Sequence, residues 1–119
     1  MKRILIAEDE INTAKGLTEL LGMWGYGVCG PVQSGREALA LAESEHPDAV
    51  LMDIRMRGKM DGIEAGKIIS ARLGIPVIIM TAYFDKIDEL QKNEKQMQYI
   101  DKPFDLAKLR ALIENCLSG

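Results

Sequence analysis

Short apolar runs alternate along this chain with longer segments in which apolar residues recur every three to four positions. The short runs are typical of buried strands, and the longer period is typical of amphipathic helices. This pattern predicts strands over 3–7, 28–32, 49–53, 76–80 and 98–100, and helices over 11–24, 35–42, 62–73, 84–95 and 106–117. Strict alternation of strand and helix favours βα units built around a parallel sheet.

Turn and capping residues support these boundaries. Ser34 and Asp61 are each followed three residues later by a glutamate, the pattern of a capping box at a helix start. Asp105 stands directly before the last predicted helix, and Gly74 follows the third one in the position of a C-terminal glycine. The second strand contains Gly30-Pro31, so we expect it at an edge of the sheet.

Composition narrows the class of protein. The chain has 119 residues, of which 47% are hydrophobic and 28% charged, as expected for one globular domain over 1–119 with no second, output domain. A net charge of -3 gives no electrostatic case for binding nucleic acid or an anionic membrane. The apolar run after Arg3 stops at Glu8, too soon for a secretory signal. Cys29 and Cys116 are interpreted as reduced thiols of a cytoplasmic protein.

Chemically active residues follow the predicted strands at their carboxyl ends. Glu8 and Asp9 follow the first strand, and Asp53 ends the third. Ligands of open parallel sheets bind beyond this edge, so the three carboxylates are expected to lie together. Hard oxygen ligands of this kind suit Mg²⁺, which retains several waters. The sequence therefore predicts a magnesium site, with one oxygen of Asp53 left available for attack on phosphorus.

A phosphoryl group also needs cations and hydrogen-bond donors at the same edge. Lys102 follows the fifth strand and supplies a mobile point charge. Thr81 follows the fourth strand and supplies a hydroxyl, and the backbone N–H of Ala82 supplies another donor. Together with Asp53, these groups predict an aspartyl phosphate site.

Each of these residues also has a structural interpretation. Glu8 and Asp9 could cap the first helix, and Asp53 could be a turn residue at a strand end. Lys102-Pro103 alone is a weak turn signal. The phosphorylation site is favoured because independent caps and turns would not place all these groups at one edge.

The residues also match a known family. The chain resembles, over its whole length, the receiver domain of two-component response regulators, in a chemotaxis-regulator-like form. The matching segments are Glu8-Asp9, Ser34-Gly35-Arg36-Glu37-Ala38-Leu39, Leu51-Met52-Asp53-Ile54, Met60-Asp61-Gly62-Ile63-Glu64-Ala65, Thr81-Ala82-Tyr83 and Tyr99-Ile100-Asp101-Lys102-Pro103-Phe104.

The resemblance implies a flavodoxin-like α/β fold, a doubly wound five-stranded parallel sheet of order 2-1-3-4-5 with five helices. It implies that Asp53 accepts a phosphoryl group from a sensor histidine kinase or a phosphotransfer protein. Glu8, Asp9, Asp53 and the backbone carbonyl of Arg55 would hold Mg²⁺. Such a domain is a regulatory phosphoacceptor and not an enzyme that turns over an external substrate.

The resemblance also assigns a switch. Thr81 and Lys102 would hold the phosphoryl group, the Lys102-Pro103 peptide would be cis, and Tyr99 would swing inward as Thr81 moves. The surface formed by helix 84–95, strand 98–100 and helix 106–117 would meet a downstream partner or a missing output domain. Considered alone, Tyr99 is a half-buried strand aromatic.

The sequence departs from the family pattern in two places. Met56-Arg57-Gly58 stands where a Met-Pro pair is common, and the loop from Asp53 to Asp61 is one residue longer. Glu94-Lys95-Gln96-Met97 replaces a common Gly-Ala before the last strand. We expect the first change to leave the chemistry intact and the second to affect the output surface.

Three other functions are considered. A phosphohydrolase of the haloacid dehalogenase type would need a second aspartate two residues after the nucleophile, where this chain has Arg55. A nucleotide-binding module would need a glycine-rich phosphate loop after a strand, and none is present. A scaffold that never carries phosphate would not need the acceptor set.

Overall fold

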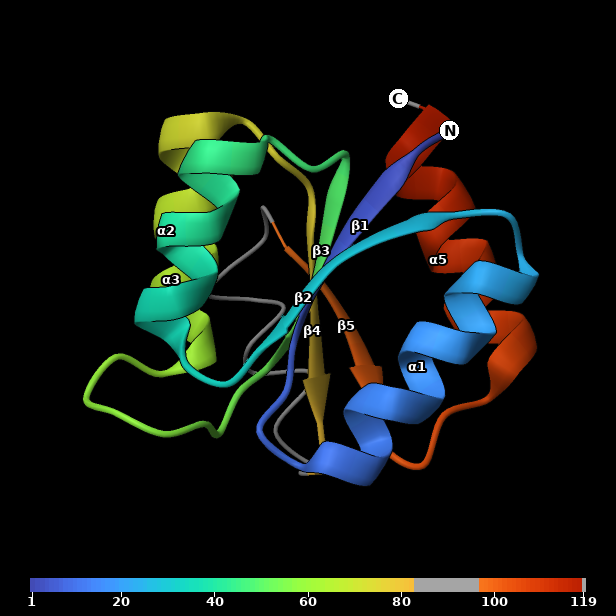
Figure 1. The fold of residues 1–119 in the computed structure, drawn as a ribbon, viewed down its shortest axis with the longest axis horizontal. Coiled ribbons are helices and arrows are strands. Elements are labelled where there is room, and N and C mark those ends of the chain that lie inside the picture. Colours follow the sequence, from blue (N-terminus) through green and yellow to red (C-terminus); the bar gives the residue numbers. More distant parts are fainter. Residues whose placement is uncertain (83–96, 119) are drawn as a thin grey trace.

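The chain folds as a parallel sheet with helices on both faces. The structure, a computed structural model, describes residues 1–82 and 97–118 (Figure 1). The strands are β1 (Arg3–Ala7), β2 (Gly27–Val32), β3 (Ala49–Asp53), β4 (Val77–Thr81) and β5 (Gln98–Asp101). They pair in the order β2-β1-β3-β4-β5, which confirms the predicted topology. Each predicted strand end lies within one residue of the observed one.

Helices connect the strands within the described part of the chain. They are α1 (Ile11–Met23), α2 (Gly35–Glu45), α3 (Gly62–Ile68) with a π-helical extension η1 (Ile69–Leu73), and α5 (Leu106–Ser118). The predicted helix over 84–95 lies outside the described residues. None of the helices that the structure describes has the length and apolar character needed to cross a membrane.

Alternation of side chains along each strand divides the core into two layers. In β3, Val50 and Met52 face the layer covered by α2 and α3, whereas Ala49 and Leu51 face α1 and α5 (Figure 1). All four are fully buried because both faces of a parallel sheet are covered. The continuous apolar run of β3 thus anchors Asp53, the residue that follows it.

The two cysteines belong to different layers of this core. Cys29 lies in the layer of α2 and α3, and Cys116 packs against the layer of α1 and α5. Both are free thiols, and burial raises the pKa of each one. Because the sheet separates them, these two residues are not placed to form a disulfide with each other.

The edge strand β2 carries two unusual backbone features. Gly30 has a φ of 89°, a conformation that favours glycine, and the Gly30–Pro31 peptide bond is cis. The pairing with β1 shifts register between Leu5 and Ala7. Pro31 has no N–H to donate to a further strand. Because β2 is an edge strand, as the sequence predicts, no strand on that side needs such a donor.

Helix starts are fixed by capping side chains. The Ser34 hydroxyl accepts a hydrogen bond from the Glu37 N–H at 3.1 Å, and the Asp61 carboxylate accepts one from the Glu64 N–H at 2.9 Å. The first helix is capped by Glu10, whose carboxylate accepts hydrogen bonds from the backbone of its first turn. The interpretation of Glu8 and Asp9 as caps is therefore wrong, since neither is the N-cap and Glu8 is buried.

The third helix changes its hydrogen bonding before it ends. The sequence predicts one helix to Leu73, but the last turn, Ile69–Leu73, is π-helical. Apolar periodicity does not separate the two forms over so short a segment, because the phase difference between them stays small. The predicted stop is confirmed, since Gly74 has a left-handed φ of 68°.

Gly62 closes the loop that follows β3. Its N–H donates a hydrogen bond to the Ile54 carbonyl at 2.8 Å. A β-carbon at this position would lie 1.9 Å from the Asp53 carbonyl oxygen, far inside contact distance. The first turn of α3 therefore rests directly on the backbone of Asp53, and only glycine permits this approach.

We predict that Gly62→Ala lowers the free energy of unfolding by about 2–3 kcal/mol, because the backbone of Asp53 or of α3 must shift to admit the new methyl group. Chemical denaturation checks this value. Gly16→Ala is the matched control, since a β-carbon there meets no atom within 4 Å and alanine favours the helix by about 0.5–1 kcal/mol. Equal effects of the two substitutions would contradict the proposed contact.

Candidate functional site

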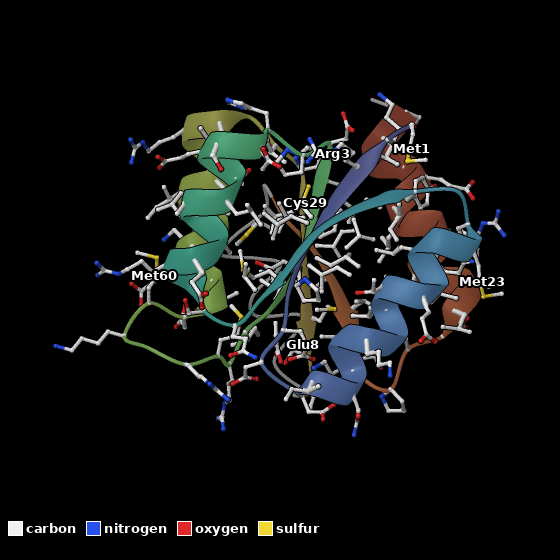
Figure 2. The ribbon with its side chains drawn as sticks, viewed as in Figure 1. Met1, Arg3, Glu8, Met23, Cys29 and Met60 are labelled. Carbon is white, nitrogen blue, oxygen red and sulfur yellow. The ribbon has the colours of Figure 1, made fainter. Side chains whose placement is uncertain are left out.

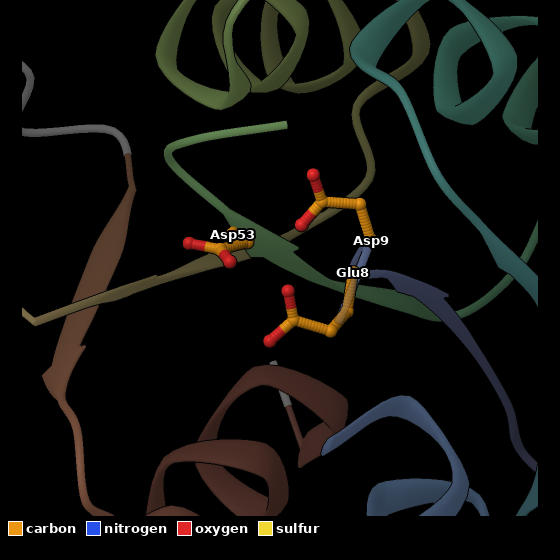
Figure 3. A group of neighbouring side chains, drawn as sticks. All are labelled: Glu8, Asp9 and Asp53. Carbon is orange, nitrogen blue, oxygen red and sulfur yellow. The ribbon is translucent and has the colours of Figure 1, made fainter. Parts of the chain in front are cut away.

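Three acidic side chains converge at the carboxyl edge of the sheet. Glu8 and Asp9 come from the end of β1, and Asp53 from the end of β3 (Figure 3). Ligand oxygens from all three lie within 4.8 Å of one another. They lie at the opposite end of the sheet from Arg3, as the positions of Glu8 and Arg3 in Figure 2 show. The structure thus brings together the three carboxylates that the sequence selected.

Lys102, which follows the edge strand β5, joins two of these carboxylates. Its Nζ lies 2.6 Å from Oε1 of Glu8 and 3.0 Å from Oδ2 of Asp53. The backbone N–H of Lys102 donates to the Thr81 carbonyl at 2.8 Å, which fixes the start of the segment after β5. The Lys102–Pro103 peptide bond is cis, in agreement with the resemblance.

This pairing is shielded from water. The Glu8 side chain has no exposed surface, and those of Asp53 and Lys102 are 14% and 23% exposed. The Glu8 N–H donates to the Val32 carbonyl at 2.9 Å, so the neighbouring edge strand holds this residue in place. Charged hydrogen bonds shielded from water are stronger than exposed ones.

The environment of Glu8 favours its protonated form. Burial, with the neighbouring Asp53 carboxylate, raises the pKa of Glu8 to about 7, while Lys102 opposes the shift. For Lys102, burial acts to lower the pKa, but the hydrogen bonds to Glu8 and Asp53 prevail and raise it. Lys102 therefore stays charged, and Glu8 is close to its protonation midpoint at neutral pH.

The donor set fits a magnesium ion. Mg²⁺ binds oxygens at about 2.1 Å in an octahedron, which separates neighbouring and opposite ligands by roughly 3–4 Å. The observed cluster, with its oxygens within 4.8 Å, needs only a slight contraction to meet this geometry. Its members are carboxylates, the ligand type that Mg²⁺ prefers. The residues that could hold the ion are therefore Glu8, Asp9 and Asp53.

A small cavity beside Asp53 contains the other predicted residues. It has a volume of about 180 Å³, and its lining residues are Asp53, Ile54, Arg55, Thr81, Ala82 and Lys102. Thr81 is almost completely buried, whereas Ala82 is exposed. The residues around this space thus include a carboxylate, a hydroxyl, a backbone N–H and an ammonium, the types of group that a phosphoryl group requires.

Tyr99 lies elsewhere in this part of the fold. It is in β5 opposite Ile79, is 3% exposed, and belongs to the core layer of α2 and α3. The residue is therefore more deeply buried than the sequence pattern alone suggests. Its neighbour across the pair, β4, carries Thr81 at its end, so both residues of the predicted switch lie on adjacent strands.

Two contacts of the site were not predicted from the sequence. The Arg55 N–H donates to Oδ1 of Asp53 at 3.4 Å, a weak bond that a two-residue spacing after an aspartate could have suggested. The Glu10 N–H lies 3.5 Å from Oε2 of Glu8, and Glu10 caps α1. The position of Glu10 directly before the helix was a signal for its role as the N-cap. The sequence alone does not favour Glu10 over Glu8 and Asp9 for this role.

A larger cavity, of about 440 Å³, lies between α1 and the end of β2. Ile11, Ala14 and Pro31 give it a largely apolar lining, and Glu8 is the one member of the acidic cluster that reaches it. Size alone does not identify the reactive site, because the donors and charges meet in the smaller cavity.

The chain belongs to the response regulator receiver domain family, whose family description it matches over residues 4–114. It is similar to the transcriptional regulatory protein PdtaR of Mycobacterium tuberculosis, with 36% identity over 98% of this chain and 57% of PdtaR. It is also similar to the regulatory protein AtoC of Escherichia coli, with 39% identity over 98% of this chain and 25% of AtoC. The chain thus spans about half or less of these two relatives.

Solved structures support the same family. The receiver domain of a signal transduction histidine kinase from Syntrophus aciditrophicus has a TM-score of 0.87 at 30% identity, covering 100% of this chain and 92% of that one. The receiver domain of the sensor histidine kinase PA1611 from Pseudomonas aeruginosa, solved with magnesium in its active-site cleft, has a TM-score of 0.83 at 30% identity, covering 99% and 98%.

These findings define the class of protein. The chain is a receiver domain of two-component signalling, a regulatory phosphoacceptor and not a turnover enzyme. They do not specifically indicate the chemotaxis-regulator subfamily, since both curated relatives named above are described as regulatory proteins, one of them transcriptional. The acidic cluster is consistent with magnesium-dependent phosphoacceptor switching.

We predict that Glu8 makes the stability of the metal-free protein depend on pH. Folding raises the Glu8 pKa from 4.5 to about 7, so the folded state binds this proton more tightly than the unfolded state does. Its contribution is full below pH 4.5 and is lost as the pH rises through about 7. Denaturation at pH 5 and pH 8, compared with Glu8→Gln, should give a difference on the order of 1 kcal/mol.

The same proton should compete with magnesium. Calorimetric titration is expected to show a roughly tenfold weaker Mg²⁺ affinity at pH 6 than at pH 8, because the ligand must be deprotonated. Glu8→Gln should bind Mg²⁺ weakly at both values. If the free energy of unfolding and the Mg²⁺ affinity of Glu8→Gln still change with pH as they do in the wild type, another group is responsible.

We predict that Lys102→Met folds but is less stable without metal by about 1–2 kcal/mol, because Glu8 and Asp53 then face each other without a cation. Millimolar Mg²⁺ should restore most of the loss, since the ion supplies the missing positive charge. Thermal denaturation with and without Mg²⁺ measures both values. Lys108→Met is the control, because its ammonium lies 4.0 Å from Asp101 and is 57% exposed. Destabilisation that Mg²⁺ leaves unchanged would argue against charge pairing.

Proposed function

We propose that this receiver domain is a phosphorylation-dependent switch in which Asp53 accepts the phosphoryl group. The observation that supports this assignment is the shared position of Asp53 in the acidic cluster and in the small cavity. Among the described residues, Asp53 is the one carboxylate that belongs to both. Glu8 and Asp9 do not line the cavity, so they serve the metal side of the site.

The proposed reaction is a transfer between two groups. One carboxylate oxygen of Asp53 attacks phosphorus in line with the leaving group and forms an O–P bond. The N–P bond of a phosphohistidine breaks, and its electron pair returns to the imidazole nitrogen, which takes a proton from water. Lys102 pairs with Oδ2 of Asp53 at 3.0 Å, and its ammonium would form a new ion pair with a phosphoryl oxygen.

Thr81 and Ala82 complete the proposed phosphoryl site. The Thr81 hydroxyl and the Ala82 N–H would donate hydrogen bonds to phosphoryl oxygens, since both residues line the cavity. Bound Mg²⁺, held by Glu8, Asp9, Asp53 and the Arg55 carbonyl, would neutralise charge on the transferring oxygens.

The switch that we propose connects this site to β5. Movement of the Thr81 hydroxyl toward a phosphoryl oxygen would open space at the end of β4, and Tyr99 on the neighbouring strand would respond. The surface that includes β5, α5 and the segment 84–95 would then meet a downstream partner. That segment lies outside the described residues, so the support comes from β5 and α5 and from the family.

The proposed partners follow from this chemistry. A sensor histidine kinase or a phosphotransfer protein would supply the phosphoryl group, and a downstream protein or an output domain would read the state of the switch. PdtaR and AtoC are described as regulatory proteins, and this chain matches only part of each. We propose that residues 1–119 form one receiver domain that acts in the cytoplasm without contacting nucleic acid itself.

We predict that the protein gains one phosphoryl group from acetyl phosphate when Mg²⁺ is present. Asp53→Asn should lower this labelling at least about a hundredfold, because the amide is not a nucleophile. Intact-mass spectrometry measures the adduct, and peptide mapping locates it.

Asp61→Asn is the matched control, since Asp61 caps α3 outside the acidic cluster and asparagine also caps helices. It should be labelled at the wild-type level. Labelling of Asp53→Asn at the wild-type level would overturn the assignment of the acceptor.

A further inference from the structure

The loop between β3 and α3 carries an unusual concentration of positive charge. Within residues 54–60, every second position from Arg55 to Lys59 is a cation, namely Arg55, Arg57 and Lys59. All three are exposed. Within the described part of the chain, Arg57 and Lys59 form no ion pair, so their charge is not neutralised by a neighbouring carboxylate.

The two ends of this loop meet at the phosphoacceptor. The Gly62 N–H donates to the Ile54 carbonyl at 2.8 Å, and the Gly62 α-carbon lies against the Asp53 carbonyl. Arg57 is three residues from Ile54, and Lys59 is three residues from Gly62. Three residues span at most about 11 Å, so each α-carbon lies within roughly that distance of an end that touches the Asp53 region.

The loop is also paired at its middle. Arg57 forms a parallel bridge with Ser34, the residue that caps α2. This pairing ties the centre of the loop to the segment after β2, on the same side of the sheet as α2 and α3. Arg57 is therefore held beside the carboxyl edge, and its separation from Ile54, about 11 Å or less, is comparable with the Debye length of roughly 8–10 Å at physiological ionic strength.

Among the described residues, carboxylates outnumber cations at this edge. Glu8, Asp9 and Asp53 form the acidic cluster, Glu10 lies beside Glu8, and Asp61 caps α3 with Glu64 in its first turn. The Glu37 side chain contacts Ser34, the residue that is bridged to Arg57. Arg57 and Lys59 offset two of these negative charges, so replacing them would make the edge more repulsive to an anionic donor.

We propose that Arg57 and Lys59 form an electrostatic rim that selects phosphodonors by their charge, favouring dianionic acyl phosphates. The rim acts on the approach of the donor and not on the transfer itself, because neither residue lines the cavity at Asp53. This inference rests on the proposed function of Asp53 as the acceptor. It adds a determinant of donor specificity outside the residues that bind metal or phosphate.

Comparison of two small donors tests the rim. Acetyl phosphate is a dianion near neutral pH, whereas phosphoramidate carries less negative charge. In Arg57→Glu/Lys59→Glu, at saturating Mg²⁺ and low ionic strength, the second-order rate of Asp53 labelling by acetyl phosphate should fall about tenfold. The rate with phosphoramidate should change by less than about twofold to threefold. Raising the salt concentration toward 1 M should remove the difference, because screening then acts within about 3 Å.

Magnesium affinity provides a readout independent of phosphorylation. The same double variant should bind Mg²⁺ about three- to tenfold more tightly, since it removes positive charge near the cluster. Slower labelling by the anionic donor together with tighter binding of the cation would indicate an electrostatic effect. A loop that merely supports the fold would weaken both.

Lys2→Glu/Arg72→Glu is the matched control, because it makes the same change in net charge at the opposite end of the sheet. It should leave both rates and the Mg²⁺ affinity near the wild-type values. Equal slowing with both donors, or a similar effect of the control, would overturn the rim while leaving Asp53 as the acceptor. Absence of Asp53 labelling in the wild type with either donor would instead overturn the proposed function.

Discussion

The ammonium of Lys102, which follows the edge strand β5, lies between two carboxylates at the ends of the inner strands β1 and β3. Glu8 and Asp53 each approach it within hydrogen-bonding distance, at 2.6 and 3.0 Å. Without this cation, or a metal ion, three acidic side chains would be brought together at an edge that is partly shielded from water. Mutual repulsion and desolvation would then oppose the fold at the point where the chemistry requires it.

The same interaction connects stability with reactivity. Lys102 pairs with two carboxylates of the cluster, yet its flexible side chain can turn to pair with a new anion without moving the backbone. Burial, together with the Asp53 carboxylate, raises the pKa of Glu8 even though Lys102 opposes the shift, so this one cation does not offset both effects. A site that retains unsatisfied negative charge attracts a second cation, which explains why a magnesium ion and a lysine can serve one small region together.

The backbone around Asp53 is fixed by contacts from two directions. Buried residues of β3 anchor it from one direction, and Gly62 packs against its carbonyl from the other. Between these contacts runs the cationic loop, whose ends are closed by the hydrogen bond between Gly62 and Ile54. In the proposed function, this scaffold would orient Asp53 as the nucleophile, and the loop would set the electrostatic field through which a donor approaches.

Much of this arrangement could be predicted from the sequence because it depends on local pattern. Short apolar runs identified the strands, helical spacing of apolar residues identified the helices, and the capping residues Ser34 and Asp61 identified two helix starts. Strand-end positions selected Glu8, Asp9, Asp53 and Lys102, because parallel strands place their carboxyl ends at one edge. The fold and the grouping of these four side chains could therefore be predicted from the sequence itself.

Other features were decided by contacts between distant segments. Lys102 and Glu8 are 94 residues apart, and neither spacing nor composition specifies that they touch or that burial raises the Glu8 pKa. The choice of Glu10 over Glu8 and Asp9 as the cap of α1 follows from the burial of Glu8 beneath Lys102. The same holds for the approach of Gly62 to Asp53 and the burial of Tyr99. Local pattern sets which groups reach the edge of the sheet, whereas distances, burial and charge balance depend on how the packed layers bring them together.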